Sequence, residues 1–225
     1  MNNDFVIGLT YADRLRLATE NRHQAIRSIF ETEVLPLTSL MGPMSDGPEW
    51  PASPAWLAAW HGNNACVFSD GLSDPWVERN KPESGLGLEV FIESPDVVLS
   101  DKQPLPSIID TWLFPMVAEI SHTLAGHPKL CEKLCNGQIT SLEFNIEHIK
   151  DGRGRVGVLL NIPYNFSQNI SLPGGEVRLV AATLLTVAEL KFLRGKGEAG
   201  RHELAEKLSS ADIGHLSLLH RPSLY

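Results

Sequence analysis

The sequence lacks long apolar runs and has few cysteines. A membrane-spanning helix needs about 20 consecutive, mostly apolar residues, and no stretch of the 225 residues reaches that length. The N-terminal segment Met1 to Asp4 also lacks the basic start and apolar stretch of a signal peptide. The 3 cysteines are too few and too unevenly placed for a disulfide framework, which fits a reducing compartment. We therefore expect a cytoplasmic protein that does not bind membranes.

Positive charge is also scarce. The chain carries 19 Lys and Arg against 27 Asp and Glu, a formal net charge of −8. Nonspecific nucleic-acid binding depends on cations that neutralise phosphates, so this balance disfavours nucleic acid as a partner. A basic protein partner would suit the charge better. The apolar content of 43% is ordinary for a globular protein that buries a sizeable core, and we expect residues 1–225 to form one domain.

No complete catalytic signature is present. The chain has no G-x-S-x-G nucleophile elbow and no H-E-x-x-H pair among its 8 histidines. Residues 152–157 match the G-x-G-x-x-G spacing of dinucleotide sites, but they precede a strand-like run instead of opening a helix. A glycine-rich turn is the favoured interpretation. We predict that the protein is not an enzyme and needs no cofactor.

One group of soft side chains could bind a metal. His127, Cys131 and Cys135 recur every four residues, which on a continuous helix would place them on one face. Further zinc ligands could come from elsewhere in the chain, namely from His122 or Cys66. However, Pro128 places His127 before the helix, and cysteines at helical spacing are often simply small buried residues. We favour this structural interpretation over a metal site.

Hydrophobic periodicity predicts an α+β fold. The predicted helices cover residues 10–32, 107–125, 129–135, 186–195 and 200–210. Residues 10–13 are expected to cap the first of them, and residues 186–189 the helix at 186–195. The predicted strands cover residues 65–69, 86–93, 139–146, 155–162, 169–172 and 176–185. Residues 177–185 are nearly all apolar, as in a central strand buried on both faces. Because helices and strands do not alternate regularly, we expect a mixed, largely antiparallel sheet packed with several helices.

Three local features are less regular. Residues 54–60 are expected to form a short helical turn or the start of a strand. Residues 36–54 are rich in proline, which predicts an irregular connection held to the surface by Met41, Met44 and Trp50. Ser107 to Asp110 resembles a capping box, and Pro115 predicts a kink or a delayed start in the helix that follows.

The segment Phe68–Trp76 concentrates turn residues, two carboxylates and a tryptophan between two strand-like runs. Asp, Gly, Ser and Pro each favour turns for a different reason, and Asp70 and Asp74 are expected to fix the turn by bonding to nearby backbone. Trp76 follows a proline in this loop. It is either a core residue or an interface anchor, since Trp is enriched among residues that dominate binding.

An enzymatic alternative uses the same residues. Asp70, Asp74 and Glu89 could form a carboxylate cluster for acid and base catalysis, together with a distant histidine such as His122 or His215. The turn-forming role is favoured because turns routinely use Asp for local hydrogen bonds to the backbone.

The same segment carries a family resemblance. Phe68–Trp76, together with Gly85–Phe91, resembles the "GLSD-aromatic … GFGFEL" signature of the suppressor of fused family. Further resemblance to bacterial members that consist of this domain alone lies in residues 184–190, 200–204 and 214–223. The resemblance covers about residues 50–225.

The resemblance implies a mixed α+β domain that binds other proteins and is not an enzyme. Animal members hold an extended peptide as an added strand between this domain and a C-terminal one; we do not expect that clamp here, since no residues remain for the second domain. Bacterial single-domain relatives are often interpreted as immunity or partner proteins in toxin systems. Trp76 matches a Tyr near the peptide-binding rim of the animal proteins. The expected partner-binding residues are Asp70, Leu72, Ser73, Asp74, Trp76 and Glu89.

Overall fold

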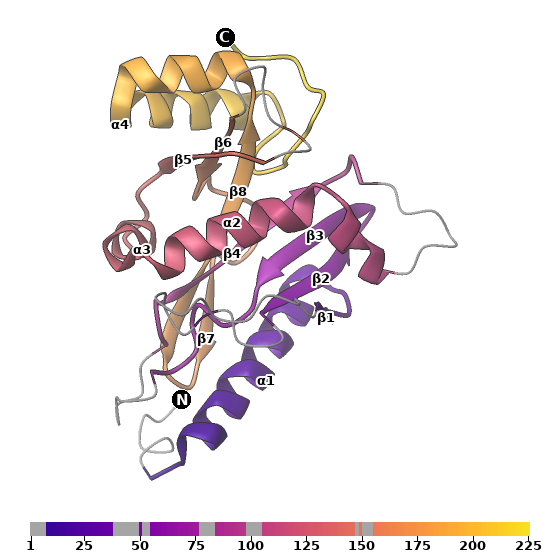
Figure 1. Ribbon diagram of the computed structural model, residues 1–225, viewed down its shortest axis with the longest axis vertical. Helices are drawn as coiled ribbons and strands as arrows, with labels where there is room; N and C mark the ends of the chain where they lie inside the picture. The colour runs from indigo at the N-terminus through magenta and orange to yellow at the C-terminus, as the bar shows by residue number, and fades with distance from the viewer. Residues whose placement is uncertain are drawn as a thin grey trace.

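An eight-stranded sheet forms the framework of the protein (Figure 1). The computed structural model describes residues 8–37, 50, 55–76, 84–97, 105–146, 149 and 155–225. The strands are β1 (Leu35–Leu37), β2 (Trp56–His61), β3 (Asn64–Ser69), β4 (Leu88–Ser94), β5 (Thr140–Phe144), β6 (Val156–Leu160), β7 (Asn169–Leu172) and β8 (Gly175–Leu185). Their order is β1-β2-β3-β4-β8-β6-β5, with β7 also paired to β8. Among these pairings only β4 with β8 is parallel, which confirms the predicted α+β class and the largely antiparallel sheet.

The long strand β8 is the centre of the sheet, as its apolar sequence predicts. On one side, residues 178–181 pair with β4. On the other side, residues 175–178 pair with β7 and residues 182–185 pair with β6. A strand with neighbours on both sides and a covered surface above and below buries both of its faces, and β8 is buried from Leu179 to Leu185.

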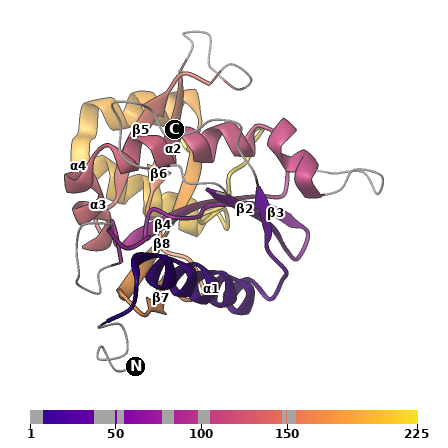
Figure 2. The ribbon, with the colours of Figure 1, turned by 60° about the horizontal axis from the view of Figure 1, so that its bottom comes forward.

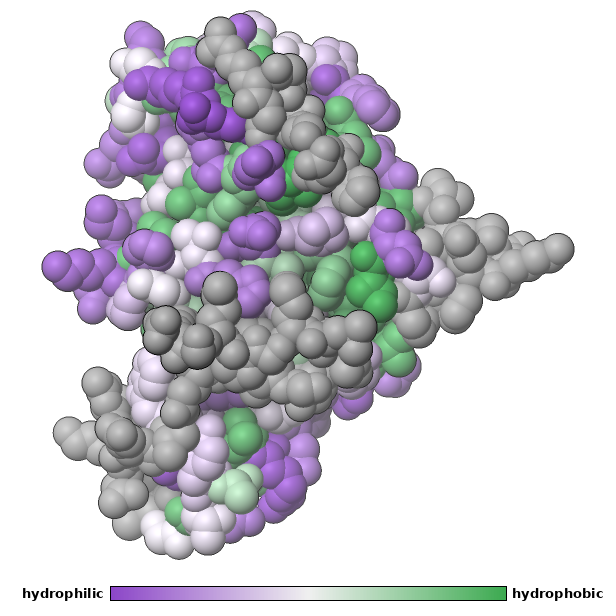
Figure 3. Space-filling model, viewed as in Figure 1, coloured by the Kyte–Doolittle hydropathy of each residue, from purple (hydrophilic) through white to green (hydrophobic). Residues whose placement is uncertain are grey.

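Helices cover both faces of the sheet. They are α1 (Tyr11–Phe30), the 3₁₀ helix η2 (Leu105–Asp110), α2 (Leu113–Ala125), α3 (Pro128–Cys135) and α4 (Val187–Ser210). Successive strand residues point to opposite faces. Val90 of β4 therefore packs in the core under α2, whereas Phe91 packs against Ile26 and Phe30 of α1 on the opposite face (Figure 2). Farther along β8, Leu185 packs against α4. Hydrophilic side chains cover α3 and α4 on the face that Figure 3 shows.

Helix ends follow the predicted caps at α1 and α4. Thr10 accepts a hydrogen bond from the backbone N–H of Asp13, and Thr186 and Glu189 form a complete capping box. The two helices predicted for residues 186–195 and 200–210 are the two segments of the kinked helix α4. They meet at Gly197, whose backbone is not helical, with φ at 58°.

The predicted capping box at Ser107 is wrong. Residues 105–110 form η2, and α2 begins only at Leu113, after Trp112, which makes no side-chain cap. Pro115 explains this late start, because proline is tolerated in the first helical turn, where backbone N–H groups have no helical acceptor. Of the two outcomes expected from Pro115, the delayed start is the one observed.

The structure near the β2–β3 hairpin can be compared with the predictions made for residues 54–60 and for the proline-rich residues 36–54. Residues 56–61 are a strand, not a helical turn, because they pair with β3 through a two-residue loop in which Gly62 adopts a φ of 59°. The proline-rich stretch begins with β1, where Pro36 lies in an edge strand that needs no donor on its outer side. Trp50 is buried in the core under α2, as an anchor should be. Other anchors, Met41 and Met44, and the start of the glycine-rich turn at 151–154 lie outside the described residues.

None of the helices in the described part of the chain combines the length and the apolar character needed to cross a membrane.

Candidate functional site

The carboxylates of the Phe68–Trp76 segment meet around one arginine from α1. The Arg22 guanidinium donates from Nε to Asp70 Oδ1 at 2.6 Å and from Nη1 to Asp74 Oδ1 at 2.8 Å. The same Nη1 donates to the Ser73 hydroxyl at 3.1 Å, and Glu89 Oε1 lies 3.6 Å from Nε. We call Arg22, Asp70, Ser73, Asp74 and Glu89 the Arg22 cluster.

Glu89 holds the turn from the opposite side. Its Oε1 accepts hydrogen bonds from the backbone N–H of Gly71 at 3.1 Å and of Ser73 at 3.0 Å, and from the Ser73 hydroxyl at 2.6 Å. Its Oε2 accepts from the Ser69 hydroxyl, whose oxygen in turn accepts from the Val90 N–H at 2.9 Å. One carboxylate thus replaces the regular strand pairing at the point where β3 turns away from β4.

Local geometry brings these side chains to one place. Arg22, Ile26 and Phe30 are four residues apart along α1, so they share the face of that helix that packs on the sheet. Glu89 and Phe91 are two residues apart on β4 and project toward the same helix. The turn after β3 then supplies Asp70 and its neighbours. The cluster therefore joins α1 to the ends of two strands.

Burial and charge shift the pKa values of the two aspartates in opposite directions. Burial works to raise the pKa of Asp70, but the charge of Arg22 and a hydrogen bond with His23 Nε2 at 2.8 Å outweigh it, and the pKa lies below its usual value. Burial raises the pKa of Asp74 to about 6, and the negative charges of Glu89 and Asp70 add to this rise against the pull of Arg22. Asp74 is thus the member of the cluster that takes up a proton near neutral pH.

This shift predicts a pH dependence of stability. Because the pKa of Asp74 is about 6 in the folded protein and lower in the unfolded chain, the folded state binds more protons between pH 7 and 5. The free energy of unfolding should therefore rise by on the order of 1 kcal/mol as the pH falls from about 7 to 5. Below about pH 4, protonation of Asp70, whose pKa is lowered, should reverse the trend.

Urea unfolding at both pH values measures this rise, and Asp74→Asn provides the control because its side chain does not titrate. An equal rise in that variant would show that another group is responsible.

Most of the predicted contact residues are inside the protein. Exposed fractions are 2% for Asp70, 3% for Leu72, and 0% for Ser73 and Glu89. The Asp74 side chain is 17% exposed. Trp76, at 39%, is the one member of the predicted set that presents a large surface to solvent. A contact with a partner through the four buried residues would require this segment to open. Of the predicted partner-binding residues, Trp76 is therefore the one best placed to contact a partner.

The carboxylates named in the enzymatic alternative do converge, but neither of its histidines joins them. His122 lies against the rings of Trp50 and Trp56, at centroid distances of 5.3 and 6.1 Å. His215 donates to a different carboxylate, Glu93. Sequence reasoning missed Arg22 and His23, because a helix residue 48 positions before its partner gives no local signal.

A second polar cluster, also missed from the sequence, surrounds Glu93. Glu93 Oε1 accepts from His61 Nδ1 at 3.0 Å and from Asn64 Nδ2 at 2.6 Å, and Oε2 accepts from His215 Nε2 at 2.9 Å. Burial works to raise the pKa of Glu93, but the hydrogen bonds from His215 and Asn64 outweigh it and the pKa is lowered. One sequence signal could have pointed to this cluster. Glu89 and Glu93 are four residues apart on a strand, which places both side chains on the same face of β4.

The candidate metal ligands are held by protein groups. His127 Nδ1 contacts the Thr123 carbonyl at 2.7 Å, and the thiols of Cys131 and Cys135 donate to the carbonyls of Leu124 and Gly87 at 3.2 and 3.4 Å. Burial raises the pKa of both thiols, that of Cys131 to about 12, whereas metal binding requires thiolates. Within the described residues, no group of three or more His, Cys, Asp or Glu could hold a metal ion.

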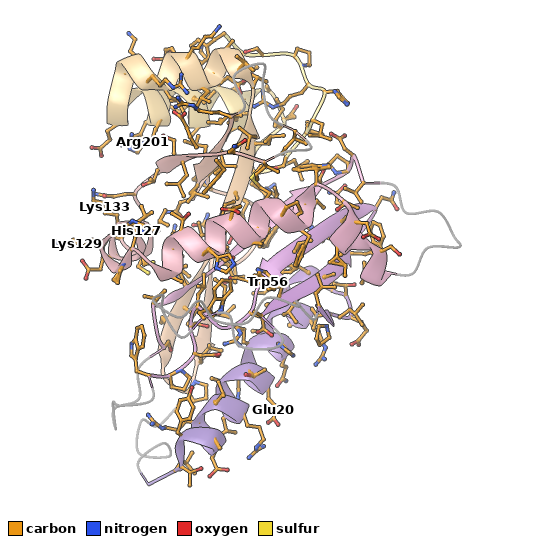
Figure 4. The ribbon with its side chains drawn as sticks, in the orientation of Figure 1. Glu20, Trp56, His127, Lys129, Lys133 and Arg201 are labelled. Atoms are coloured by element: carbon orange, nitrogen blue, oxygen red, sulfur yellow. The ribbon has the colours of Figure 1, made fainter. Side chains whose placement is uncertain are left out.

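Figure 4 shows His127 at the left side of the view, beside Lys129 and Lys133 of α3, and the charge of these lysines would disfavour a cation there. The same view shows Trp56 beneath α2.

Comparison with known proteins gives information on the fold. No family model and no curated protein sequence matches the chain. The structure is similar to a solved structure described as the Sufu-Fu complex crystal structure, with a TM-score of 0.55, 13% sequence identity and coverage of 91% of each chain. At this identity the likeness concerns architecture. The chain therefore has a Sufu-like α+β fold.

Proposed function

We propose that this protein is a non-enzymatic protein-binding module whose contact surface is centred on Trp76. The observation that carries the proposal is the likeness of its fold to Sufu, whose solved structure is described as a complex with Fu. A fold can serve many functions, so the residues on its surface must supply the remaining argument.

The position of Trp76 supports a role as an anchor. Trp76 directly follows Pro75, whose ring fixes the backbone, and lies two residues after Asp74 of the Arg22 cluster. The cluster holds this turn through charged hydrogen bonds in a buried setting, which are stronger than neutral ones. A rigidly presented aromatic side chain loses little conformational entropy when it binds, which favours affinity.

The hydrogen bonds made by the Asp70 and Glu89 carboxylates support a non-enzymatic role. A general acid or base must come within hydrogen-bonding reach of the group that it protonates or deprotonates. Both oxygens of Asp70 are engaged, by Arg22 and His23, and both oxygens of Glu89 are engaged by the turn. These groups serve the architecture of the segment.

We propose that the partner is another protein in the cytoplasm, and that this chain acts as an immunity or neutralising protein in a bacterial toxin system. The net charge of −8 suits a basic partner. Neither nucleic acid nor membrane is proposed as a ligand.

The proposal predicts that Trp76→Ala weakens partner binding by at least tenfold, because truncation of an anchoring Trp typically costs about 2 kcal/mol or more. Affinity capture from the cells that make the protein, followed by mass spectrometry, identifies the partner, and calorimetry with the purified partner measures the loss. Ile109→Ala is the matched control, since Ile109 is equally exposed at 38% but lies on η2. Equal affinity of the wild-type protein and Trp76→Ala for that partner would remove Trp76 from the contact.

A further inference from the structure

A pocket of about 360 Å³ lies beside Glu93 and the two histidines that donate to it, His61 and His215. Its walls come from the β2–β3 hairpin, from Glu93 of β4, from the segment 163–166 and from the C-terminal end of α4 with the residues that follow. The lining residues are His61, Asn64, Glu93, Pro163, Tyr164, Asn165, Phe166, Ser209, Asp212, Ile213, Gly214, His215 and Leu216. This site is distinct from the Arg22 cluster and from Trp76.

Glu93 fixes which nitrogen of each histidine carries a proton. Its lowered pKa keeps the carboxyl group ionised at neutral pH, and an ionised carboxylate can only accept hydrogen bonds. His61 must therefore donate from Nδ1, and His215 from Nε2. In its neutral form, His61 then keeps a lone pair on Nε2. The His61 side chain is 36% exposed, so this acceptor belongs to an accessible ring.

The charge of the pocket is negative. Glu93 and Asp212 contribute two carboxylates, and no lysine or arginine occurs among the described residues that line it. The last turn of α4 ends at the same place, and the C-terminus of a helix carries partial negative charge. Lys207, the basic residue of that turn, is engaged elsewhere: its Nζ lies 3.7 Å from the centre of the Tyr225 ring.

Aromatic rings supply a surface suited to a cation. The centroids of Tyr164 and Phe166 are 4.4 Å apart, and the Phe166 ring lies 5.5 Å from that of His61. The Tyr164 hydroxyl donates to the Leu179 carbonyl at 2.6 Å, which fixes its ring. Ring faces attract ammonium and guanidinium groups electrostatically.

We propose that this pocket binds an organic cation, a guanidinium or ammonium group on an alkyl stem. Asp212 pairs with the charge, His61 Nε2 accepts one of its hydrogen bonds, and the rings of Tyr164 and Phe166 contact the stem and the cationic head. The cation belongs either to a basic side chain of a protein or to a free amine, because both present the same chemistry. The inference goes beyond the proposed protein-binding function and does not depend on Trp76.

A nuclear magnetic resonance titration of the full chain with three probes tests this assignment. The probes are agmatine, the capped tripeptide acetyl-Gly-Arg-Gly-amide, and the same tripeptide with citrulline, a neutral isostere of arginine. Agmatine is expected to bind and to shift the resonances of the pocket residues, and the citrulline peptide to bind at least tenfold more weakly than the arginine peptide. Binding of the arginine peptide as well as agmatine would identify a protein side chain as the source, and binding of agmatine alone a free amine. The proposal would be overturned if neither agmatine nor the arginine peptide bound at concentrations up to about 10 mM. It would also be overturned if the arginine peptide bound and the citrulline peptide bound equally tightly.

Asp212→Asn locates the site. Asp212 is exposed and adopts a φ of 56°, which Asn tolerates well, so the fold should be retained. Agmatine affinity should fall about fivefold, because an ion pair at a partly exposed site contributes up to about 1 kcal/mol. Asp110→Asn, an exposed carboxylate outside the pocket, should leave the affinity unchanged. An unchanged affinity in Asp212→Asn, with the fold verified by its thermal transition, would also overturn the assignment.

Discussion

Replacement of Arg22 by Met is expected to lower the free energy of unfolding by about 3 to 5 kcal/mol, or to prevent folding at ambient temperature. The substitution keeps much of the aliphatic stem but removes the cation that three carboxylates share. Arg22 is 1% exposed, and so is the Asp70 side chain bonded to it. Water cannot replace the lost partner, and each buried carboxylate must then take up a proton or remain unpaired.

Arg16→Met is the matched control, because it makes the same change on the same helix. Arg16 pairs with Glu20 one turn away, at 3.1 Å, and their side chains are 60% and 58% exposed. Such a surface pair contributes at most about 0.5 kcal/mol. Urea unfolding of both variants gives the comparison. A loss at Arg22 as small as that at Arg16 would show that the cluster contributes no net stability.

A double substitution separates lost charge from lost packing. If unpaired carboxylates cause the instability, Asp70→Asn should be strongly destabilising alone but should restore part of the stability when added to Arg22→Met. Additive losses would instead point to packing of the arginine stem as the main contribution.

Gly85→Ala is expected to have the second large effect, a loss of about 3 kcal/mol in the free energy of unfolding. Gly85 adopts a φ of 47°, and a Cβ atom there would meet the carbonyl oxygen of Asp74 and lie 2.7 Å from that of Leu72. Both obstacles are backbone atoms, and the Leu72 carbonyl also accepts the Leu86 N–H at 2.8 Å. The neighbours cannot move aside without breaking the turn that Glu89 holds.

Gly62→Ala separates the clash from backbone strain. Gly62 has a similar φ of 59°, but a Cβ atom there would meet nothing within 4 Å. This variant should lose only the cost of a positive φ, about 1 kcal/mol. Chemical unfolding of the two variants measures the difference, and equal losses at both positions would show that the close approach at Gly85 is unimportant.

These two predictions explain what the family-like signature does in this chain. The segment Phe68–Trp76 and the run that begins at Gly85 meet because Glu89 hydrogen-bonds the turn, Gly85 passes close to its backbone, and Arg22 neutralises its carboxylates. Such constraints act on the stability and shape of the fold. The signature therefore marks an architecture, whereas the proposed contact depends on its exposed end at Trp76.

The sequence alone predicted the elements whose signals are local. The apolar run in β8, the cap at Thr10 and the capping box at Thr186 all act within a few residues, and each was recognised correctly. The capping box predicted at Ser107 was wrong, and residues 54–60 were left open between a helical turn and the start of a strand, because in both places the local pattern had two solutions. Pairing with β3 decided the second case, and that pairing is a property of the sheet.

Only the tertiary structure decided which polar groups meet. Arg22 and Asp70 are 48 residues apart in the chain, and Glu93 and His215 are 122 residues apart. No local pattern indicates such contacts, because they depend on how α1 crosses the sheet and how the segment after α4 returns to β4. The sequence by itself determined the α+β class and most of its helices and strands, since propensity, caps and periodicity act locally. The burial of the carboxylates, the exposure of Trp76 and the pocket beside Glu93 follow from long-range packing.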